Sequence, residues 1–234
     1  MNVLKFLASS AVLFGAISAS CAFAAEENAE APGAGKETPP FADIFNGKDL
    51  TGWVVEGTTT RGSGDDKSPV WTVKDGEIRC AGGGFGFLRF DRAACDFTLK
   101  AEIKLEPKAN SGIGIRTVPF RTVRQTRPSF AAYEVQIQDD AGAPADKHCS
   151  GSLYRYVAPT ENAMKPAGEW NTVEITCTGP RIVIKINDRT VQDVDQSKIE
   201  EIKNKPLCGY ICLQNHGSPA VFRKVQMQVM KAAE

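Results

Sequence analysis

A short alternating stretch, residues 133–139, carries the side chains with the greatest capacity for chemistry. It reads YEVQIQD. In a β-strand, neighbouring side chains point to opposite faces, so the apolar residues would face a core. The other face would then carry Glu134, Gln136 and Gln138 in a row. One carboxylate and two amides suit a sugar or a metal ion, although an ordinary half-buried strand with a solvated face shows the same alternation.

Two other segments have polar faces with the same parity. Residues 112–116 read GIGIR, which places two glycines and Arg116 on the face opposite the isoleucines. Glycines at alternate positions open that face to a ligand, although Arg116 could also be a plain surface cation at a strand end. Residues 209–217 end in a polar cluster in which Gln214 and His216 share a face. We expect the three strands to form one site around the carboxylate of the first.

Two long loops flank the 133–139 strand, at residues 117–130 and 140–150. Loops of this length in a compact domain are usually functional or mobile. The second loop contains His148. The first is basic and holds Arg121, Arg124 and Arg127.

Strand-like segments recur along the chain from residue 41 onward. Residues 96–106 are the clearest of them, because apolar and polar side chains alternate over the whole segment. No sustained helical period occurs between the strands. This pattern predicts an all-β sandwich of two antiparallel sheets in one domain, residues 41–234. Its roughly 195 residues suffice for a sizeable core, and the concave face of a curved sheet is the natural ligand site.

The N-terminus reads as a segment for export. Residues 1–25 have the features of a signal peptide, with an apolar run over 6–17 and a small-residue cleavage site at 22–24. An alternative is lipidation at Cys21. Residues 26–40 are rich in Ala, Glu, Gly and Pro and predict a disordered tether. We therefore expect a periplasmic, cell-surface or secreted protein.

The charge balance excludes several classes of partner. The chain has 28 Lys and Arg residues against 28 Asp and Glu residues, so its formal net charge is zero. Binding to nucleic acids or to anionic membranes requires a basic surplus, so neither is expected. After the predicted signal, no apolar stretch is long enough to span a bilayer.

Cysteine usage agrees with export. Six of the seven cysteines remain after the predicted cleavage, and an exported protein permits disulfides. Six cysteines allow fifteen pairings, among which the sequence does not choose. A bridge between Cys208 and Cys212 is not expected, because they lie four apart on a predicted strand. No CxxC spacing occurs, so a zinc site built from thiolates is not expected either.

In order and spacing, these segments and several others resemble the DUF1080, or 3-keto-disaccharide hydrolase, family. The opening motif is FNGKDLTGW over residues 45–53, and the match continues to residue 229. The YEVQ segment at 133–136 and the LQNHG segment at 213–217 belong to it. The other matching segments are WxVxDG at 71–76, NSGI at 110–113 with Arg116, GSLY at 151–154, EWN at 169–171 and FR at 222–223.

The resemblance implies a concanavalin A- or LamG-like jelly roll that acts on glycosides oxidised at C3 of the sugar. The C3 ketone acidifies the C2 proton, a base removes that proton, and the C1 substituent leaves. Water then adds to the enone, which gives net hydrolysis. The implied partner is an oxidised sugar or glycoside, here a 3-keto-disaccharide or a related substrate.

This chemistry needs a base, an acid and a group that stabilises the enolate. Glu134 and His216 are the candidates for base and acid, either way round, and Arg116 is the candidate for stabilising the ketone or enolate. Alternatively, a divalent metal held by Glu134, His216 and an amide could replace Arg116 as the electrophile. The candidates for binding the substrate are Gln136, Gln138, Gln214, Glu102, Tyr154 and His148.

Other functions on the same fold have to be weighed. A non-catalytic carbohydrate-binding module would show exposed aromatic residues for stacking on sugars, whereas most aromatic residues here have core parity. A structural envelope module is a further alternative. A retaining β-glucanase needs two carboxylates about 5 Å apart, and no ExDxxE run occurs. The sequence therefore favours an enzyme for 3-keto-glycosides over these alternatives.

Overall fold

The computed structural model describes residues 38–232, and nearly all of their regular structure is β. The predicted signal peptide and all but the last residues of the predicted tether lie outside this range, as does Cys21, so those assignments stay predictions. Among residues 38–232, no helix has the length and apolar character needed to cross a membrane.

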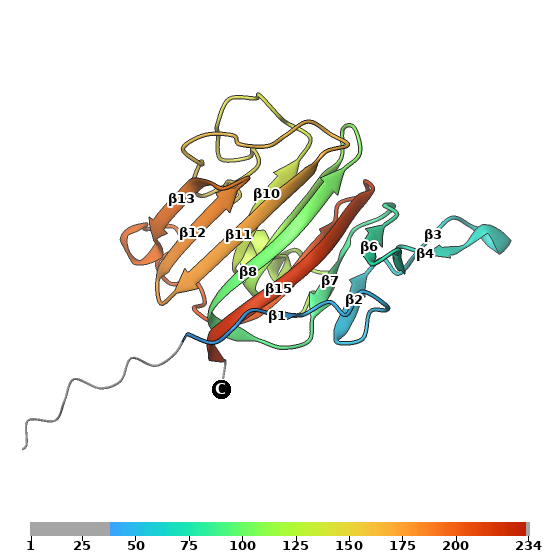
Figure 1. The fold of residues 1–234 in the computed structure, drawn as a ribbon, viewed down its shortest axis with the longest axis horizontal. Coiled ribbons are helices and arrows are strands. Elements are labelled where there is room, and N and C mark those ends of the chain that lie inside the picture. The colour runs from blue at the N-terminus through green and yellow to red at the C-terminus, as the bar shows by residue number, and fades with distance from the viewer. Residues whose placement is uncertain (1–37, 233–234) are drawn as a thin grey trace, which may run out of the picture. The chain divides into compact units, whose positions relative to one another are not determined.

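The larger of two sheets, sheet A, forms one layer of the fold. Its strands are β1 (Ala42–Asp43), β5 (Trp71–Lys74), β6 (Glu77–Cys80), β8 (Ala94–Leu105), β11 (Trp170–Thr178), β12 (Arg181–Ile186), β13 (Arg189–Asp195) and β15 (Ala220–Ala232). Their order is β13-β12-β11-β8-β15-β6-β5, with β1 also paired to β15. The long strands β11, β8 and β15 lie side by side (Figure 1). Every pairing within sheet A is antiparallel.

The second sheet, sheet B, carries the site strands. It consists of β2 (Trp53–Gly57), β7 (Gly86–Phe90), β9 (Asn110–Thr117), β10 (Tyr133–Gln138) and β14 (Tyr210–Asn215). The order β10-β9-β14-β7-β2 places the three strands expected to form the site next to one another. The predicted all-β jelly-roll sandwich of two antiparallel sheets is thus confirmed.

Short elements lie between the strands of the two sheets. They are the ribbon β3 (Thr60–Arg61) with β4 (Ser68–Pro69), the 3-10 turns η1 (Gly64–Asp66), η2 (Arg124–Thr126) and η3 (Gln196–Lys198), and the single-turn helix α1 (Pro128–Ala131). The turn η2 and the helix α1 lie in the basic loop that precedes β10. That loop is therefore partly folded.

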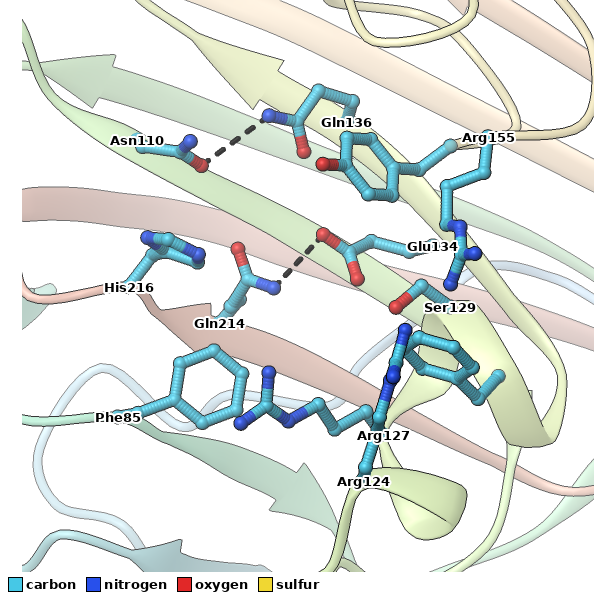
Figure 2. A pocket seen from close by; sticks show the side chains of 12 residues that line it. Phe85, Asn110, Arg124, Arg127, Ser129, Glu134, Gln136, Arg155, Gln214 and His216 are labelled. Carbon is cyan, nitrogen blue, oxygen red and sulfur yellow. Dashed lines mark hydrogen bonds between the residues drawn. The ribbon is translucent and has the colours of Figure 1, made fainter.

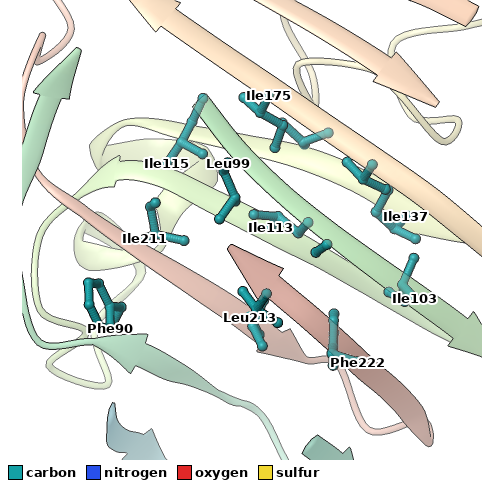
Figure 3. Packing of buried hydrophobic residues seen from close by; sticks show 14 of the residues in the cluster. Phe90, Leu99, Ile103, Ile113, Ile115, Ile137, Ile175, Ile211, Leu213 and Phe222 are labelled. Carbon is teal, nitrogen blue, oxygen red and sulfur yellow. The ribbon is translucent and has the colours of Figure 1, made fainter. Parts of the chain in front are cut away.

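The core lies between the two sheets. Alternation sends the apolar residues of each strand to the same side, so Leu99 and Ile103 of β8 meet Ile113 of β9 and Ile137 of β10 in one cluster (Figure 3). Each of these side chains is at most 1% exposed. Burying a side chain of this size stabilises the fold by about 1.5–3 kcal/mol. The polar residues between them are consequently directed to the outer faces.

One disulfide links the sheets. Cys95 of β8 is bonded to Cys208, which lies just before β14. Beside it, Ala94 and Gly209 exchange backbone hydrogen bonds of 3.0 and 3.1 Å. The other four cysteines of residues 38–232 are buried thiols. The disulfide thus joins a strand of sheet A to the start of a site strand in sheet B.

Candidate active site

A cavity of about 350 Å³ opens on the outer face of sheet B, the face turned away from sheet A. Its lining comes from three neighbouring strands and from the segments around them: Glu134 and Gln136 of β10, Asn110 of β9, Gln214 of β14, and side chains from the loops on either side. Figure 2 shows these groups converging on the carboxylate of Glu134. The predicted centre of the site is therefore also the centre of the cavity.

Gly112 of β9 leaves the space in which side chains of the two adjoining strands, β10 and β14, form a hydrogen bond. Gln214 Nε2 donates a hydrogen bond of 2.9 Å to Glu134 Oε1 across β9. A Cβ atom on Gly112 would lie 3.3 Å from Glu134 Cγ and 3.4 Å from Gln214 Oε1. The Cβ atom would also lie 3.2 Å from the carbonyl oxygen of Val135, so Glu134 and its strand would have to shift by a few tenths of an ångström relative to Gln214. Gly112, which was expected to leave room for a ligand, therefore leaves room for the hydrogen bond between Gln214 and Glu134.

Gly114, also on β9, has a different neighbour. A Cβ atom there would lie 2.5 Å from Cys212 Sγ and 2.8 Å from Pro128 Cγ. Pro128 opens helix α1, a position at which its fixed φ suits a helix and its missing N–H costs nothing. The bare backbone of Gly114 therefore lets α1 rest on the sheet, and α1 brings the buried Ser129 to the cavity.

Glu134 is a buried carboxylate, 6% exposed. Burial disfavours its charged form and raises its pKa above the usual value. Hydrogen bonds from Gln214 and Ser129 and the charges of Arg127 and Arg155 oppose this increase without cancelling it. Such a group has a stronger affinity for a proton than an exposed glutamate, which is the property that a general base requires.

A row of amides continues from Glu134 along β10. Gln136 Nε2 donates to Asn110 Oδ1 at 3.3 Å and to Gln138 Oε1 at 3.0 Å. Gln138 Nε2 in turn donates to Asp140 Oδ2 at 3.0 Å. Within residues 38–232, the buried Oε1 atoms of Gln136 and Gln214 have no partner. Both oxygens are therefore open to hydroxyl donors of a substrate.

Three arginines line the cavity, and each stacks on an aromatic ring. Arg127 lies over Phe85, with its guanidinium carbon 4.3 Å from the ring centroid. Arg124 and Arg155 both stack on Phe130, at 4.4 and 4.3 Å. Cation–π contacts of this kind hold a guanidinium in place without neutralising its charge.

His216 lies on the other side of the cavity, one residue beyond β14. It is exposed and lines the cavity, and its ring packs edge-on against Phe85 at 5.5 Å. Figure 2 shows Gln214 between His216 and Glu134. The two residues expected to act as base and acid thus lie on opposite sides of one amide, and both face the cavity.

Tyr154 and His148 belong to the border of the site. Tyr154 lines the cavity, and its backbone N–H donates to the carbonyl oxygen of Glu134 at 2.8 Å. The neighbouring segment, residues 151–153, pairs with β10 on its outer edge through Gly151, Ser152 and Leu153. His148 is exposed and packs against the ring of Tyr154 at 5.2 Å. His148 does not line the cavity; its ring contacts Tyr154, and its carbonyl oxygen accepts a hydrogen bond of 3.3 Å from Gln138 Nε2.

The expected position of Arg116 in the site is wrong. A bulge in the pairing of β9 with β14 interrupts the alternation, and Arg116 has a φ of 53°. Its side chain is fully buried, and Nε and Nη2 donate to the carbonyl oxygen of Cys95 at 3.2 and 2.8 Å. Asp96 lies 3.6 Å from Nη2. Arg116 therefore ties β9 to β8 and does not line the cavity.

The expected position of Glu102 is also wrong. Glu102 does point outward, but from β8 of sheet A, where it forms ion pairs of 2.6 Å with Arg223 and with Lys224. The cavity lies on the outer face of the other sheet. Parity gave the correct direction for this side chain, but parity does not say which sheet a strand joins.

A resident metal ion is not supported by the donor set. Among residues 38–232, no three His, Cys, Asp or Glu side chains gather in one place. The predicted ligands Glu134 and His216 would need an amide as the third donor, and Gln214 turns its N–H toward Glu134. Metal sites normally use three or more oxygen, nitrogen or sulfur donors of the protein.

Several lining residues were not predicted as site residues. Ser129, Phe130 and Arg155 all reach the cavity from loops or from α1. The Pro128-Ser129 pair does carry a signal for a helix start. The placement of Arg155 depends on a φ of 76°, which the residue type does not reveal.

Comparison with known proteins agrees with this fold. A sequence model of the 3-keto-alpha-glucoside-1,2-lyase-like domain matches residues 40–228. No match was found among curated proteins. Two crystal structures of candidate glycosyl hydrolases from Parabacteroides distasonis are similar in fold. The first is 22% identical, with a TM-score of 0.67 over 82% of this chain and 94% of the other. The second is 21% identical, with a TM-score of 0.64 over 82% and 100%.

Proposed function

Because the chain belongs to the family of 3-keto-α-glucoside-1,2-lyase-like domains, we propose that it cleaves 3-keto-glycosides by elimination followed by hydration. Family membership gives the protein a carbohydrate-related function, and the proposal adds the oxidised substrate and the mechanism. We also propose that the protein is exported, on the features of residues 1–25.

One observation carries the mechanism: of the described residues that line the cavity, only Glu134 has a carboxylate. Ordinary retaining and inverting glycosidases use two carboxyl groups flanking the glycosidic bond. A single buried base beside several cations instead suits the removal of a proton next to a ketone, because that step needs one base and a positive charge at the forming enolate.

In the proposed elimination, Glu134 takes the proton from C2 of the sugar. The electron pair moves toward the C3 oxygen, where the charge of Arg127 stabilises the enolate. This is the role that the sequence had suggested for Arg116. His216, on the other side of Gln214, gives a proton to the departing oxygen at C1. Gln214 and Ser129 hold the carboxylate of Glu134 in position.

In the proposed hydration, water adds across the C1–C2 double bond. Its oxygen bonds to C1 and gives one proton to His216, while Glu134, whose proton exchanges with solvent between the two steps, protonates C2, so that the acid and the base are both regenerated. The products are the free 3-keto sugar and the alcohol, which together account for one water consumed. The unpaired Oε1 atoms of Gln136 and Gln214 are positioned to accept hydrogen bonds from sugar hydroxyls during both steps.

The aromatic residues of the cavity favour an enzyme over a binding module. Phe85 and Phe130 are each stacked against at least one arginine. A sugar ring would have to displace a cation before stacking on these faces. This argues against the sugar-stacking platforms that non-catalytic carbohydrate modules use.

The test is incubation of the purified protein with 3-keto-trehalose or a 3-keto-glucoside in D₂O, with the unoxidised glycoside as control. We expect cleavage of the oxidised substrate alone, with deuterium incorporated at C2 of the sugar. Glu134→Gln should reduce turnover by at least about a hundredfold, the scale of a lost general base. Parallel reactions with EDTA report whether a divalent ion takes part.

Equal cleavage of the unoxidised glycoside, or cleavage without deuterium at C2, would contradict the elimination. Undiminished turnover by the folded Glu134→Gln variant would contradict the assignment of the base.

A further inference from the structure

The cavity carries more positive charge than an enolate requires. Arg124, Arg127 and Arg155 face a single carboxylate, Glu134, although the whole chain has a formal net charge of zero. Positive charge is therefore concentrated at this place on the molecule.

Six of the nine other arginines of residues 38–232 are paired with acids. Those with an ion pair are Arg79, Arg89, Arg116, Arg181, Arg189 and Arg223. In contrast, Arg124, Arg127 and Arg155 make no ion pair within 4.0 Å to any acid of residues 38–232. The cavity is thus lined by three arginines that form no direct ion pair and that share one carboxylate, Glu134.

Arg124 and Arg155 are held at the same aromatic ring. Both guanidinium carbons lie within 4.4 Å of the centroid of the Phe130 ring. Lys205 adds a third cation nearby, because its Nζ donates at 2.8 Å to the carbonyl oxygen of Phe130. Burial, followed by the charge of Arg155, lowers the pKa of Lys205 to about 8. Like charges gathered around one ring repel each other, and an anion bound beside the ring would relieve this repulsion.

We propose that the substrate carries an anionic group, a carboxylate or a sulfate, which binds between Arg124 and Arg155 beside Phe130. The guanidinium group suits both anions, since it presents paired N–H donors that match two oxygens. The inference rests on the proposed function, because it takes this cavity as the substrate site.

The geometry assigns the anionic group to the oxidised sugar and not to the leaving group. In Figure 2, Arg155 lies on the far side of Glu134 from His216. His216 faces the departing oxygen at C1, so the aglycone extends toward His216. A group near Arg124 and Arg155 must therefore belong to the sugar that loses its C2 proton. Uronate sugars and sulfated sugars both satisfy this description.

The test compares kcat/KM for three substrates with one common aglycone: a 3-keto-glucoside, the corresponding 3-keto-glucuronide and the corresponding 6-sulfated 3-keto-glucoside. We expect at least one charged substrate to be preferred by about tenfold or more, as for one added charge-assisted hydrogen bond. The two charged substrates distinguish carboxylate from sulfate. The double variant Arg124→Gln/Arg155→Gln should lose most of that preference, and Arg121→Gln, an exposed arginine of the same loop, should keep it.

A binding measurement separates this inference from the proposed function. Glu134→Gln is titrated calorimetrically with the unoxidised glucuronide, sulfated glucoside and neutral glucoside, for which no turnover is needed. Tighter binding of an anionic ligand that weakens between about 50 mM and 500 mM salt would support the inference even if no keto-sugar is cleaved.

Equal binding of the charged and neutral ligands would overturn the inference while leaving the elimination mechanism intact. It would also be overturned if the double variant lost activity equally on charged and neutral substrates, because the arginines would then serve only the transition state. Thermal unfolding of each variant controls for misfolding.

Discussion

Glu134 combines two opposing influences on one carboxylate. Its burial favours the protonated form, whereas Gln214, Ser129 and two arginines favour the charged form. The net result is a raised pKa. A base must be ionised to accept a proton, so activity should fall on acidification through a pKa above that of an ordinary glutamate.

The Gln214 hydrogen bond is predicted to set part of this pH dependence. It lowers the pKa of Glu134 by favouring the charged carboxylate, so Gln214→Leu should raise that pKa further. The acidic limb of a plot of kcat/KM against pH should therefore move to higher pH. Gln226→Leu, on the outer face of sheet A, is the control and should leave the limb in place. A shift to lower pH in Gln214→Leu would contradict this account.

At the scale of elements, β9 acts as a spacer between the two strands that carry the functional groups. Its glycines serve different purposes, since Gly112 lies between Glu134 and Gln214 whereas Gly114 lies beneath α1. Neither glycine has a positive φ, so space alone limits substitution. The two positions can therefore be compared directly.

We predict that alanine has different effects at the two positions. Gly112→Ala should separate Gln214 from Glu134 and lower kcat/KM by about 10- to 100-fold, as for a small displacement of a catalytic group. Its stability cost should stay near or below about 1 kcal/mol, because each neighbour has to move by only a few tenths of an ångström. Gly114→Ala meets Cys212 and Pro128 and should cost about 1–3 kcal/mol. Urea unfolding and kinetics measure both effects, and equal stability of the two variants would refute the distinction.

The elements were predictable from the sequence to different degrees. The strict alternation of residues 133–138 and 96–105 fixed two strands and the direction of their side chains, including Glu134 and Gln136. The position of Arg116 was predicted wrongly, because a bulge and its own left-handed backbone conformation reverse the direction of its side chain. The residue type indicates neither feature. Glu102 was predicted to line the site although it lies on the other sheet, because the alternation of side chains does not reveal the order of the strands. Ser129 and Arg155 depend on loop conformations, which no periodicity describes.

For the molecule as a whole, the Cys95–Cys208 disulfide closes a long loop of the chain. The two cysteines are 113 residues apart and connect the two sheets at one end. A crosslink over so long a loop restricts the unfolded chain strongly. Arg116, bonded to the carbonyl oxygen of Cys95, lies at the same end.

We predict that Cys95→Ser/Cys208→Ser loses about 2–5 kcal/mol of unfolding free energy, the usual cost of removing a native disulfide. Guanidinium unfolding of the wild type should show a similar loss after reduction with dithiothreitol. The double variant is the matched control and should not respond to the reductant, because its remaining cysteines in residues 38–232 are buried thiols. An unchanged wild-type midpoint after complete reduction would contradict the prediction.

The pairing of residues 151–154 with β10 has a consequence beyond the site. The outermost strand of a sheet normally exposes unpaired N–H and C=O groups to which strands of other molecules can add, and such addition leads to aggregation. Here the outward backbone groups of Gln136 and Glu134 already form hydrogen bonds with the backbone of Gly151, Ser152 and Tyr154. The strand that carries the base is therefore closed to strand addition by a second molecule, and the cavity beside it stays accessible at high protein concentration.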